Sequence, residues 1–509
     1  MTPARSRQQR QRAALGVGDI LAGVTVAMVV IPQSLAYAEL AGMPAYTGLY
    51  TTALPAIAAA FFVSSPYLQT GTSAMTALLT FGALSQLAPP GSSAYIGLAA
   101  LLALIVGLVR LLIGFARFGS VAYLMSQPVL IGFTSAAAIL ILSSQLPTVF
   151  GAPAPSNGIL QRAFWTLSHP HLWDLTSLGL SVMTVALILL GRRLHPLFPG
   201  VLLAVGLGIG LSRLTGYEGA VIGSIPSGLP RLHLALPWTT VPTLVISGGV
   251  IALVGFVETA SICRTYATQD RMKWDANQEF ISQGVANVAA GLCGGFPAGG
   301  SFGRSAINRL AGAKSRWSGA ATGLVVLAFL PFTAVLSALP KAILGAIVIT
   351  AVVSLIRPQQ LVELWRYSHP QASIAWLTFG LTLVFAPRID IAVLIGIGLA
   401  VAQHLRREQQ LVFQHWVDAS AGVLHFKPLG VLWFGSASSL EETFTALLAE
   451  YPDLHKAKLH LSGLGRIDLS GAITLKQMIS DAKQAGIEIE LLEVPPMAKS
   501  WVARVWHDG

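Results

Sequence analysis

The chain has 509 residues, of which 54% are hydrophobic and only 11% are charged, and its formal net charge is +10. A soluble globular protein carries about 25% charged residues, so this composition excludes a soluble protein and predicts an integral membrane protein. Basic loops follow from the positive-inside rule, and no nucleic-acid partner is needed to explain them. Two cysteines, Cys263 and Cys293, predict neither a disulfide framework nor a zinc site.

The first apolar run follows a basic N-terminal segment, residues 1–15. Its "AYA" before Glu39 resembles a signal-peptide cleavage site. Pro32 and Gln33 lie inside the run, however, and it continues directly into more membrane sequence, which favours a first membrane span. In chain order, fourteen spans are predicted near residues 18–38, 45–63, 71–87, 94–113, 120–143, 174–190, 198–214, 242–264, 277–293, 300–313, 317–338, 342–356, 370–386 and 388–404.

The charge distribution predicts the orientation of this membrane domain, residues 16–407. An even number of spans places both of its ends on one side of the membrane. Basic clusters at residues 5–12 and 404–407 identify this side as the cytoplasm. We therefore expect a multi-pass protein of the inner (plasma) membrane with both termini in the cytoplasm.

Two of the predicted spans are preceded by stretches that break helices. The third follows "SSPYLQTGTSAM", residues 64–75, and the tenth follows "GGFPAGGSFGR", residues 294–304. Each is the third element of a set of seven. Interrupted segments at matching positions in two halves are typical of transporters built from inverted repeats, here predicted at residues 16–215 and 240–405.

In the last part of the chain, residues 410–509, the long apolar runs give way to short segments with strand and helix patterns. "GVLHFKPLGVLWFGSA" predicts short strands around a Pro/Gly turn, and "SSLEETFTALLAEY" predicts an amphipathic helix. "AKLHLSGL" predicts a buried strand, "DLSGAITLKQMISDAKQAG" a second helix and "IEIELLEV" a closing strand. Strands that alternate with helices indicate a small soluble α/β domain.

The first two spans carry "GDILAGVTVAMVVIPQSLAYAELAGMPAYTGLYTTALP", residues 18–55. This stretch resembles the signature of the sulfate permease (SulP) family, also called solute carrier family 26. "QTGTSAM" resembles a Gly-Pro-x-Ala segment of the family, but Thr72 and Ser73 stand where proline is common. "GGFPAGGSFGRSAINRLAGAKS" resembles the motif of the tenth span, and residues 410–509 resemble a STAS domain.

The resemblance implies a fold of fourteen spans in a seven-plus-seven inverted repeat. Spans 1–4 and 8–11 would form a core domain, and spans 5–7 and 12–14 a gate domain. It also implies a homodimer that transports anions, such as sulfate, bicarbonate or C4-dicarboxylates, without a cofactor. Members are exchangers or symporters coupled to protons or sodium.

The two broken segments predict where an anion would bind. A half-helix that begins at mid-membrane has unpaired amides and a dipole end worth about +0.5 charge. Inverted repeats would aim two such ends at one point, which makes an anion site. The candidate residues are Thr72, Ser73, Gly300, Ser301, Phe302 and Gly303. The alternative is that the glycines only allow close packing of helices.

Three further side chains are candidates for this site. Arg304 lies about one turn inside the tenth helix and would attract an anion, unless it snorkels or pairs with a carboxylate. Gln33, placed near the substrate by the resemblance, can donate a hydrogen bond from its amide. Tyr37 lies one turn further on and would line the same cavity or serve only in packing.

Glu258 is the first candidate for coupling to protons. It lies in the middle of the eighth span, at the position where the resemblance implies an acidic residue for the coupling ion. A structural hydrogen bond is the alternative, and sodium is not excluded as the coupling ion. Glu39, near the end of the first span, is the second candidate, for which packing or gating is an equal alternative.

The sequence thus favours a secondary active anion transporter that works by alternating access. An anion exchanger, an anion channel and, less favoured, a nucleobase permease are the alternatives. An enzyme is not expected, because the glycine-rich stretch contains neither GK[ST] nor GxGxxG. In the C-terminal domain, Ser470 is either a phosphorylated serine, by resemblance to anti-sigma factor antagonists, or part of a helix cap together with Asp468.

Overall fold

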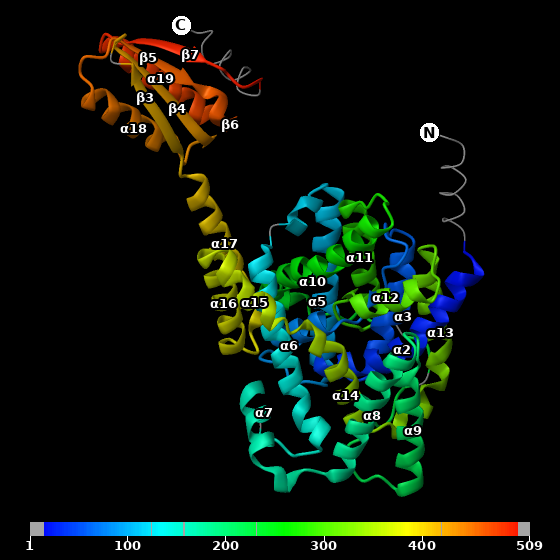
Figure 1. The fold of residues 1–509 in the computed structure, drawn as a ribbon. Helices are drawn as coiled ribbons and strands as arrows, with labels where there is room; N and C mark the ends of the chain where they lie inside the picture. Colours follow the sequence, from blue (N-terminus) through cyan, green and yellow to red (C-terminus); the bar gives the residue numbers. More distant parts are fainter. Residues whose placement is uncertain are drawn as a thin grey trace. The chain divides into compact units, whose positions relative to one another are not determined.

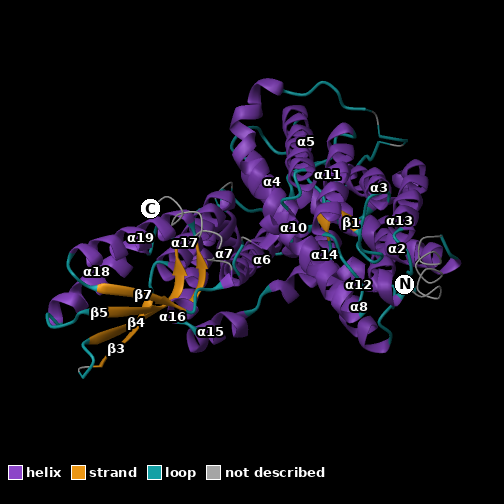
Figure 2. Cartoon of the chain, turned by 90° about the horizontal axis from the view of Figure 1, so that it is seen from above, coloured by secondary structure: helices purple, strands orange, loops and turns teal. Residues whose placement is uncertain are grey.

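The computed structural model describes residues 15–496 apart from 124, 156–157, 227, 231 and 419. All but the last residue of the predicted N-terminal segment, residues 1–15, therefore lies outside the described residues. The chain divides into two compact units, residues 1–397 and 398–509, and each is described by itself. The first is almost wholly helical, and the second is an α/β domain (Figures 1 and 2).

The helices of the first half are α2 Val17–Leu40, α3 Tyr46–Ala60, α4 Ala74–Leu84, α5 Ser93–Phe115, α6 Gln127–Phe150, α7 Ile159–Ser168, α8 Leu175–Leu194 and α9 Gly200–Thr215. Those of the second half are α10 Val241–Gln269, α11 Ala276–Leu292, α12 Phe302–Leu310, α13 Trp317–Phe329, α14 Lys341–Val352, α15 Pro358–Tyr367, α16 His369–Val384 and α17 Ile389–Glu408. Short 3₁₀ helices lie at Gly119–Tyr123, Pro170–Leu172, Trp238–Thr240, Leu330–Ala338 and Val353–Leu355.

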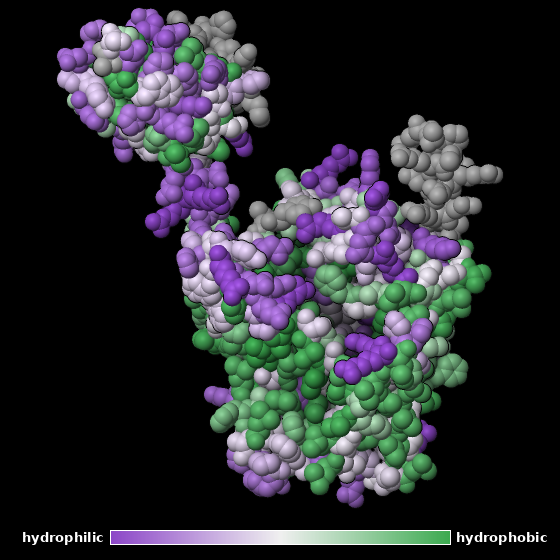
Figure 3. Space-filling model, in the orientation of Figure 1, coloured by the Kyte–Doolittle hydropathy of each residue, from purple (hydrophilic) through white to green (hydrophobic). Residues whose placement is uncertain are grey.

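Within the described residues, eight helical segments are long and apolar enough to span a membrane. Two shorter apolar helices, α4 and α9, are among the remaining predicted spans. The eleventh predicted span, 317–338, is a composite of α13 and a 3₁₀ helix that begins at Leu330, next to Pro331. On the face of the first unit that Figure 3 shows, a band of hydrophobic residues lies between two more hydrophilic ends, as expected for a surface that faces lipid.

The helices of the first unit pack in two groups. In one group, α5 packs on α10 and α11, and α13 packs on α2 and α3. In the other, α14 packs on α6 and α8, and α16 packs on α6. These groups correspond to the predicted core domain and gate domain. The pairs α5–α11 and α3–α13 are formed by spans 4 and 9 and by spans 2 and 11, which are equivalent pairs in a seven-plus-seven repeat.

Two short extended segments meet in the middle of the core group. β1, Thr70–Gly71, pairs antiparallel with β2, Gly299–Gly300 (Figure 2). Thr70 lies opposite Gly300, and Gly71 lies opposite Gly299. Each strand is followed directly by a half-helix, α4 or α12. The predicted starts of the two half-helices are therefore confirmed to within a few residues.

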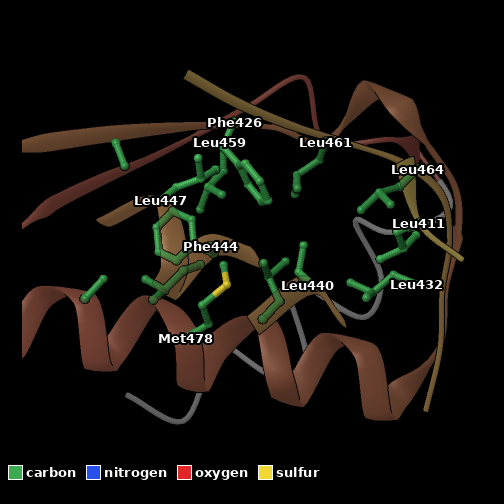
Figure 4. Close-up of a cluster of buried hydrophobic side chains, with 14 of the residues drawn as sticks. Leu411, Phe426, Leu432, Leu440, Phe444, Leu447, Leu459, Leu461, Leu464 and Met478 are labelled. Carbon is green, nitrogen blue, oxygen red and sulfur yellow. The ribbon is translucent and has the colours of Figure 1, made fainter. Parts of the chain in front are cut away.

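After the end of α17, the described residues of the second unit form five strands and two α-helices. The strands are β3 Val412–Asp418, β4 Val423–Leu432, β5 Lys456–His460, β6 Leu464–Ile467 and β7 Glu488–Leu492, and the helices are α18 Ala437–Glu450 and α19 Leu469–Gln484. The sheet has the order β3-β4-β5-β7, and β6 also pairs with β4. Only the β3–β4 pair is antiparallel. Leucines and phenylalanines of the sheet and of both helices fill the core between them (Figure 4).

One prediction for this domain is wrong. The stretch predicted as short strands around a Pro/Gly turn is a single strand, β4, that runs through Pro428. Proline cannot donate a hydrogen bond to a neighbouring strand. Here Val423–Phe426 pairs with β5 and the stretch from Gly430 to Leu432 pairs with β6, so Pro428 lies between the two ladders on that side.

Candidate anion site between two half-helices

The extended segments before the half-helices obtain their hydrogen bonds from buried polar side chains. The amide of Asn287 accepts from the Ala298 N–H at 2.9 Å and donates to the Ala298 carbonyl at 3.1 Å. The hydroxyls of Thr51 and Thr259 accept from the N–H groups of Phe296 and Gly300, both at 3.1 Å. An unpaired amide inside a membrane costs several kcal/mol. These side chains make an extended backbone tolerable at this depth.

The two half-helices begin differently. In α4 the N-cap is Ser73, whose hydroxyl accepts from the Thr76 N–H at 3.2 Å. In α12 the N-cap Ser301 has no side-chain cap, and Gly303 in the first turn faces open space. The free amides and the dipole of α12 therefore point at a hollow region, which is the arrangement that attracts a negative charge.

A cavity of about 470 Å³ lies at these helix ends, between the core and gate groups. Eight of the predicted site residues line it, namely Gln33, Tyr37, Ser73, Glu258, Ser301, Phe302, Gly303 and Arg304. Thr72 and Gly300 do not line it: both are buried directly behind it, where the Thr72 carbonyl accepts a hydrogen bond from Arg304 and the Gly300 N–H is held by Thr259.

Arg304 is a buried positive group that lines the cavity. Its side chain is 1% exposed, and Nη2 donates to the Thr72 carbonyl at 2.5 Å. Nε and Nη1 have no hydrogen-bond partner among the described residues. Buried donors are almost always paired, so two unpaired donors on one buried guanidinium are unusual. The predicted alternatives, snorkelling to the surface or pairing with a carboxylate, do not describe Arg304.

Glu258 faces the same cavity from α10. It interacts electrostatically with Arg304 and with Tyr37. No oxygen of Glu258 lies within 4.0 Å of a guanidinium nitrogen of Arg304, so the two side chains do not form an ion pair. A carboxylate and a cation thus share one cavity without neutralising each other by direct contact.

Glu39 lies elsewhere. It lines a second cavity, of about 540 Å³, and its carboxylate forms an ion pair with Lys341 at 2.7 Å. Glu39 is at the end of α2 in the core group, and Lys341 begins α14 in the gate group. Glu39 therefore does not line the cavity of Arg304 and Glu258, and its packing, gating or coupling role stays a prediction.

In the second unit, Asp468 caps helix α19, because its carboxylate accepts from the Gly471 N–H at 2.7 Å. Ser470 is exposed in the first turn of the helix. The interpretation of this motif as a helix cap is therefore supported for Asp468, and Ser470 remains accessible.

Several residues of the site were not among the sequence candidates. Arg192, Arg264 and Arg357 also line the cavity of Arg304. From the sequence, Arg192 and Arg264 are basic residues that follow apolar runs and predict only orientation. Asn287 lies within the ninth predicted span, where an amide side chain in a predicted membrane helix was the available signal of a buried hydrogen-bonding role.

Comparison with known proteins identifies the family and the fold. The model of the sulfate permease family matches residues 17–378, and that of the STAS domain matches residues 417–505. A probable sulfate transporter of Mycobacterium tuberculosis is 34% identical over 399 residues, which cover 77% of this chain and 70% of the relative. Probable sulfate transporter 4.2 of Arabidopsis thaliana is 32% identical over 395 residues, and the match spans 58% of its length.

Solved structures share the fold. The murine solute carrier 26 family member A9 anion transporter, in its inward-facing state, superposes with a TM-score of 0.87 at 23% identity, over 97% of this chain and 88% of that one. The transmembrane domain of the cyanobacterial bicarbonate transporter BicA gives a TM-score of 0.63 at 24% identity, over 75% of this chain and 97% of that one. On the family match, the chain belongs to the sulfate permease family, whose membrane domain here precedes a STAS domain.

Proposed function

We propose that this protein is a secondary active transporter that carries a small anion, of the sulfate, bicarbonate or C4-dicarboxylate class, together with a proton. The observation that carries the proposal is the pair of free donors on Arg304, buried at the uncapped start of α12 in a cavity between the core and gate groups. Transport would follow from movement of the core group against the gate group, which gives alternating access.

The position of Glu258 supports coupling to protons. Its ionised carboxylate repels an anion bound at Arg304, and its protonated form does not. Proton binding and anion binding therefore favour each other, and by linkage each raises the affinity for the other by the same factor. No group of three or more His, Cys, Asp or Glu residues that could hold a metal ion occurs among the described residues. Sodium bound by other oxygen ligands is the competing coupling ion.

The names of relatives support the substrate class. Besides the probable sulfate transporters, a sodium-independent sulfate anion transporter of Bos taurus is 29% identical over 521 residues, which cover 94% of this chain. We propose, by the same likeness, that the protein is a homodimer in the inner membrane with the STAS domain in the cytoplasm. Phosphorylation of the exposed Ser470 would regulate it.

Purified protein in proteoliposomes tests the proposal. Uptake of labelled sulfate, succinate and bicarbonate is measured with an inward proton gradient, with a sodium gradient and with neither. We expect saturable uptake of at least one anion that the proton gradient alone drives above equilibrium. Uptake that needs a counter-anion inside the vesicle indicates an exchanger, and flux that never exceeds equilibrium indicates a channel; either result contradicts symport. Uptake of uracil without uptake of any anion would indicate a nucleobase permease.

A further inference from the structure

A second buried arginine lies beside the residue that precedes β2 and does not line the cavity. Arg110, on α5, is 0% exposed and ranks with Arg304 among the largest fully buried side chains. Its neighbours along the sequence are apolar, and it does not line the cavity of Arg304. Such a residue is costly inside a membrane and is a functional candidate by default.

Arg110 is bonded only to neutral groups. Nε donates to the Ala252 carbonyl at 3.1 Å, Nη1 to the Ala298 carbonyl at 2.9 Å and Nη2 to the Ile251 carbonyl at 3.3 Å. None of the ion pairs found among the described residues involves Arg110. Each of its three nitrogens therefore donates to a carbonyl, but its charge is not neutralised by a direct partner among the described residues.

The guanidinium lies one layer of atoms behind the start of α4. A Cβ atom at Gly255 would be 2.7 Å from Arg110 Nη2 and 3.1 Å from Thr76 Cγ2. A Cβ atom at Gly299 would be 3.3 Å from the same Thr76 methyl and 3.5 Å from Ser73 Oγ. Arg110 is thus separated from Ser73, which lines the cavity, by little more than Gly255 and Thr76, and this space excludes water.

We propose that Arg110 is a positioning residue that supplies a fixed positive potential to the anion site and thereby favours divalent over monovalent anions. It does not touch the anion: it holds the segment before α12 against α10 through the Ala298 carbonyl, and its charge acts through the buried backbone. In a medium of low dielectric constant, a charge at this depth is screened far less than a surface charge. This inference rests on the proposed function, because it requires an anion at Arg304.

The charge of the anion distinguishes this role from a purely structural one. A Coulomb energy is proportional to the charge of the ligand, so a dianion loses twice as much binding energy as a monoanion when the potential is removed. The factor by which the affinity for the dianion falls is therefore the square of the factor for the monoanion. A substitution that only distorts the geometry of the site lowers the affinities for the monoanion and the dianion by similar factors. Sulfate and perchlorate are suitable probes, because both are tetrahedral oxyanions and they differ in charge.

The test measures Kd for sulfate and for perchlorate by titration of the full-length protein in nanodiscs. For Arg110→Gln, we expect perchlorate affinity to fall about threefold and sulfate affinity about ninefold, as the charge scaling requires. Arg110→Lys keeps the charge but cannot reach three carbonyls, so its ratio of sulfate to perchlorate affinity stays at the wild-type value while its Tm falls. Arg309→Gln is the matched control, since Arg309 is already paired with Asp270 at 2.6 Å, and its ratio stays unchanged.

Equal losses of both anions in Arg110→Gln would overturn the inference and leave the anion site intact. If Arg110→Gln does not fold, the neutral variant Arg110→Met is titrated in the same way: a larger loss for sulfate than for perchlorate supports the inference, and equal losses overturn it. Wild-type protein that binds neither anion nor succinate would instead refute the proposed function, and this inference with it.

Discussion

The free donors of Arg304 allow a quantitative prediction for Arg304→Met, which removes the charge and keeps much of the apolar volume. Nε and Nη1 have no partner among the described residues. We predict that an anion in the cavity accepts a hydrogen bond from each of them. A hydrogen bond that involves a charged group contributes about 1.5–3 kcal/mol, and the loss of two costs at least about 3 kcal/mol. Since about 1.4 kcal/mol is a tenfold change, Kd should rise on the order of a hundredfold.

The assay is titration of the preferred anion into purified protein in nanodiscs, with Tm as a check of folding. Arg304→Lys retains a point charge but not the forked donors, and we expect an intermediate Kd. Arg309→Met removes an arginine that is already paired with Asp270, on the same helix, and serves as the matched control. A folded Arg304→Met variant whose Kd stays within about threefold of wild type would refute the assignment of Arg304 to the site.

Three other substitutions test the coupling, the space and the scaffold of the site. In wild type, anion affinity should rise as pH falls, because protonation removes the charge of Glu258. Glu258→Gln should abolish both this pH dependence and proton-driven uptake, whereas the control Glu39→Gln should keep both. If Glu39→Gln abolishes them and Glu258→Gln keeps them, Glu39 is the coupling residue instead of Glu258. Gly300→Leu should abolish anion binding, because even a Cβ atom at Gly300 would lie 2.9 Å from Thr259 Oγ1. The control Gly179→Leu should bind the anion normally, because a Cβ atom at Gly179 would have no other atom within 4 Å. Normal anion affinity in Gly300→Leu would contradict the packing argument. Asn287→Ala leaves the Ala298 N–H unpaired and should lower stability by about 1–3 kcal/mol, measured as a fall in Tm, and an unchanged Tm would show that water replaces the amide.

The half-helix starts could be predicted because their sequences contain strong local signals. Five glycines and a proline in residues 294–304 cannot continue a helix, and a break in an apolar run implies a buried extended segment. The order of the spans and the division into core and gate groups also followed from the hydropathy and the family resemblance. The helix starts depend on residues that are close together in the sequence. The order and grouping of the spans depend on a pattern of apolar runs that recurs in both halves of the membrane domain.

The remaining features depend on contacts between distant residues, which a single sequence does not record. Thr70 and Gly300 pair across 230 positions in strands of two residues each, too short for any periodicity. Arg110 looks like an isolated basic residue in an apolar run, and its partners are backbone carbonyls, which leave no complementary residue type in the sequence. The strand through Pro428 is possible only because β5 and β6 pair with different parts of β4.

The pairing of β1 with β2 has a consequence for how the two halves of the membrane domain can change in evolution. Because side chains alternate along a strand, insertion or deletion of one residue in either lead-in would turn its neighbours to the opposite face and shift one helix start relative to the other. The Thr70–Gly300 and Gly71–Gly299 pairs therefore fix the lengths of both lead-ins together. Any length change in one repeat requires a compensating change in the other, so the two repeats are bound to diverge by substitution at this point rather than by insertion or deletion.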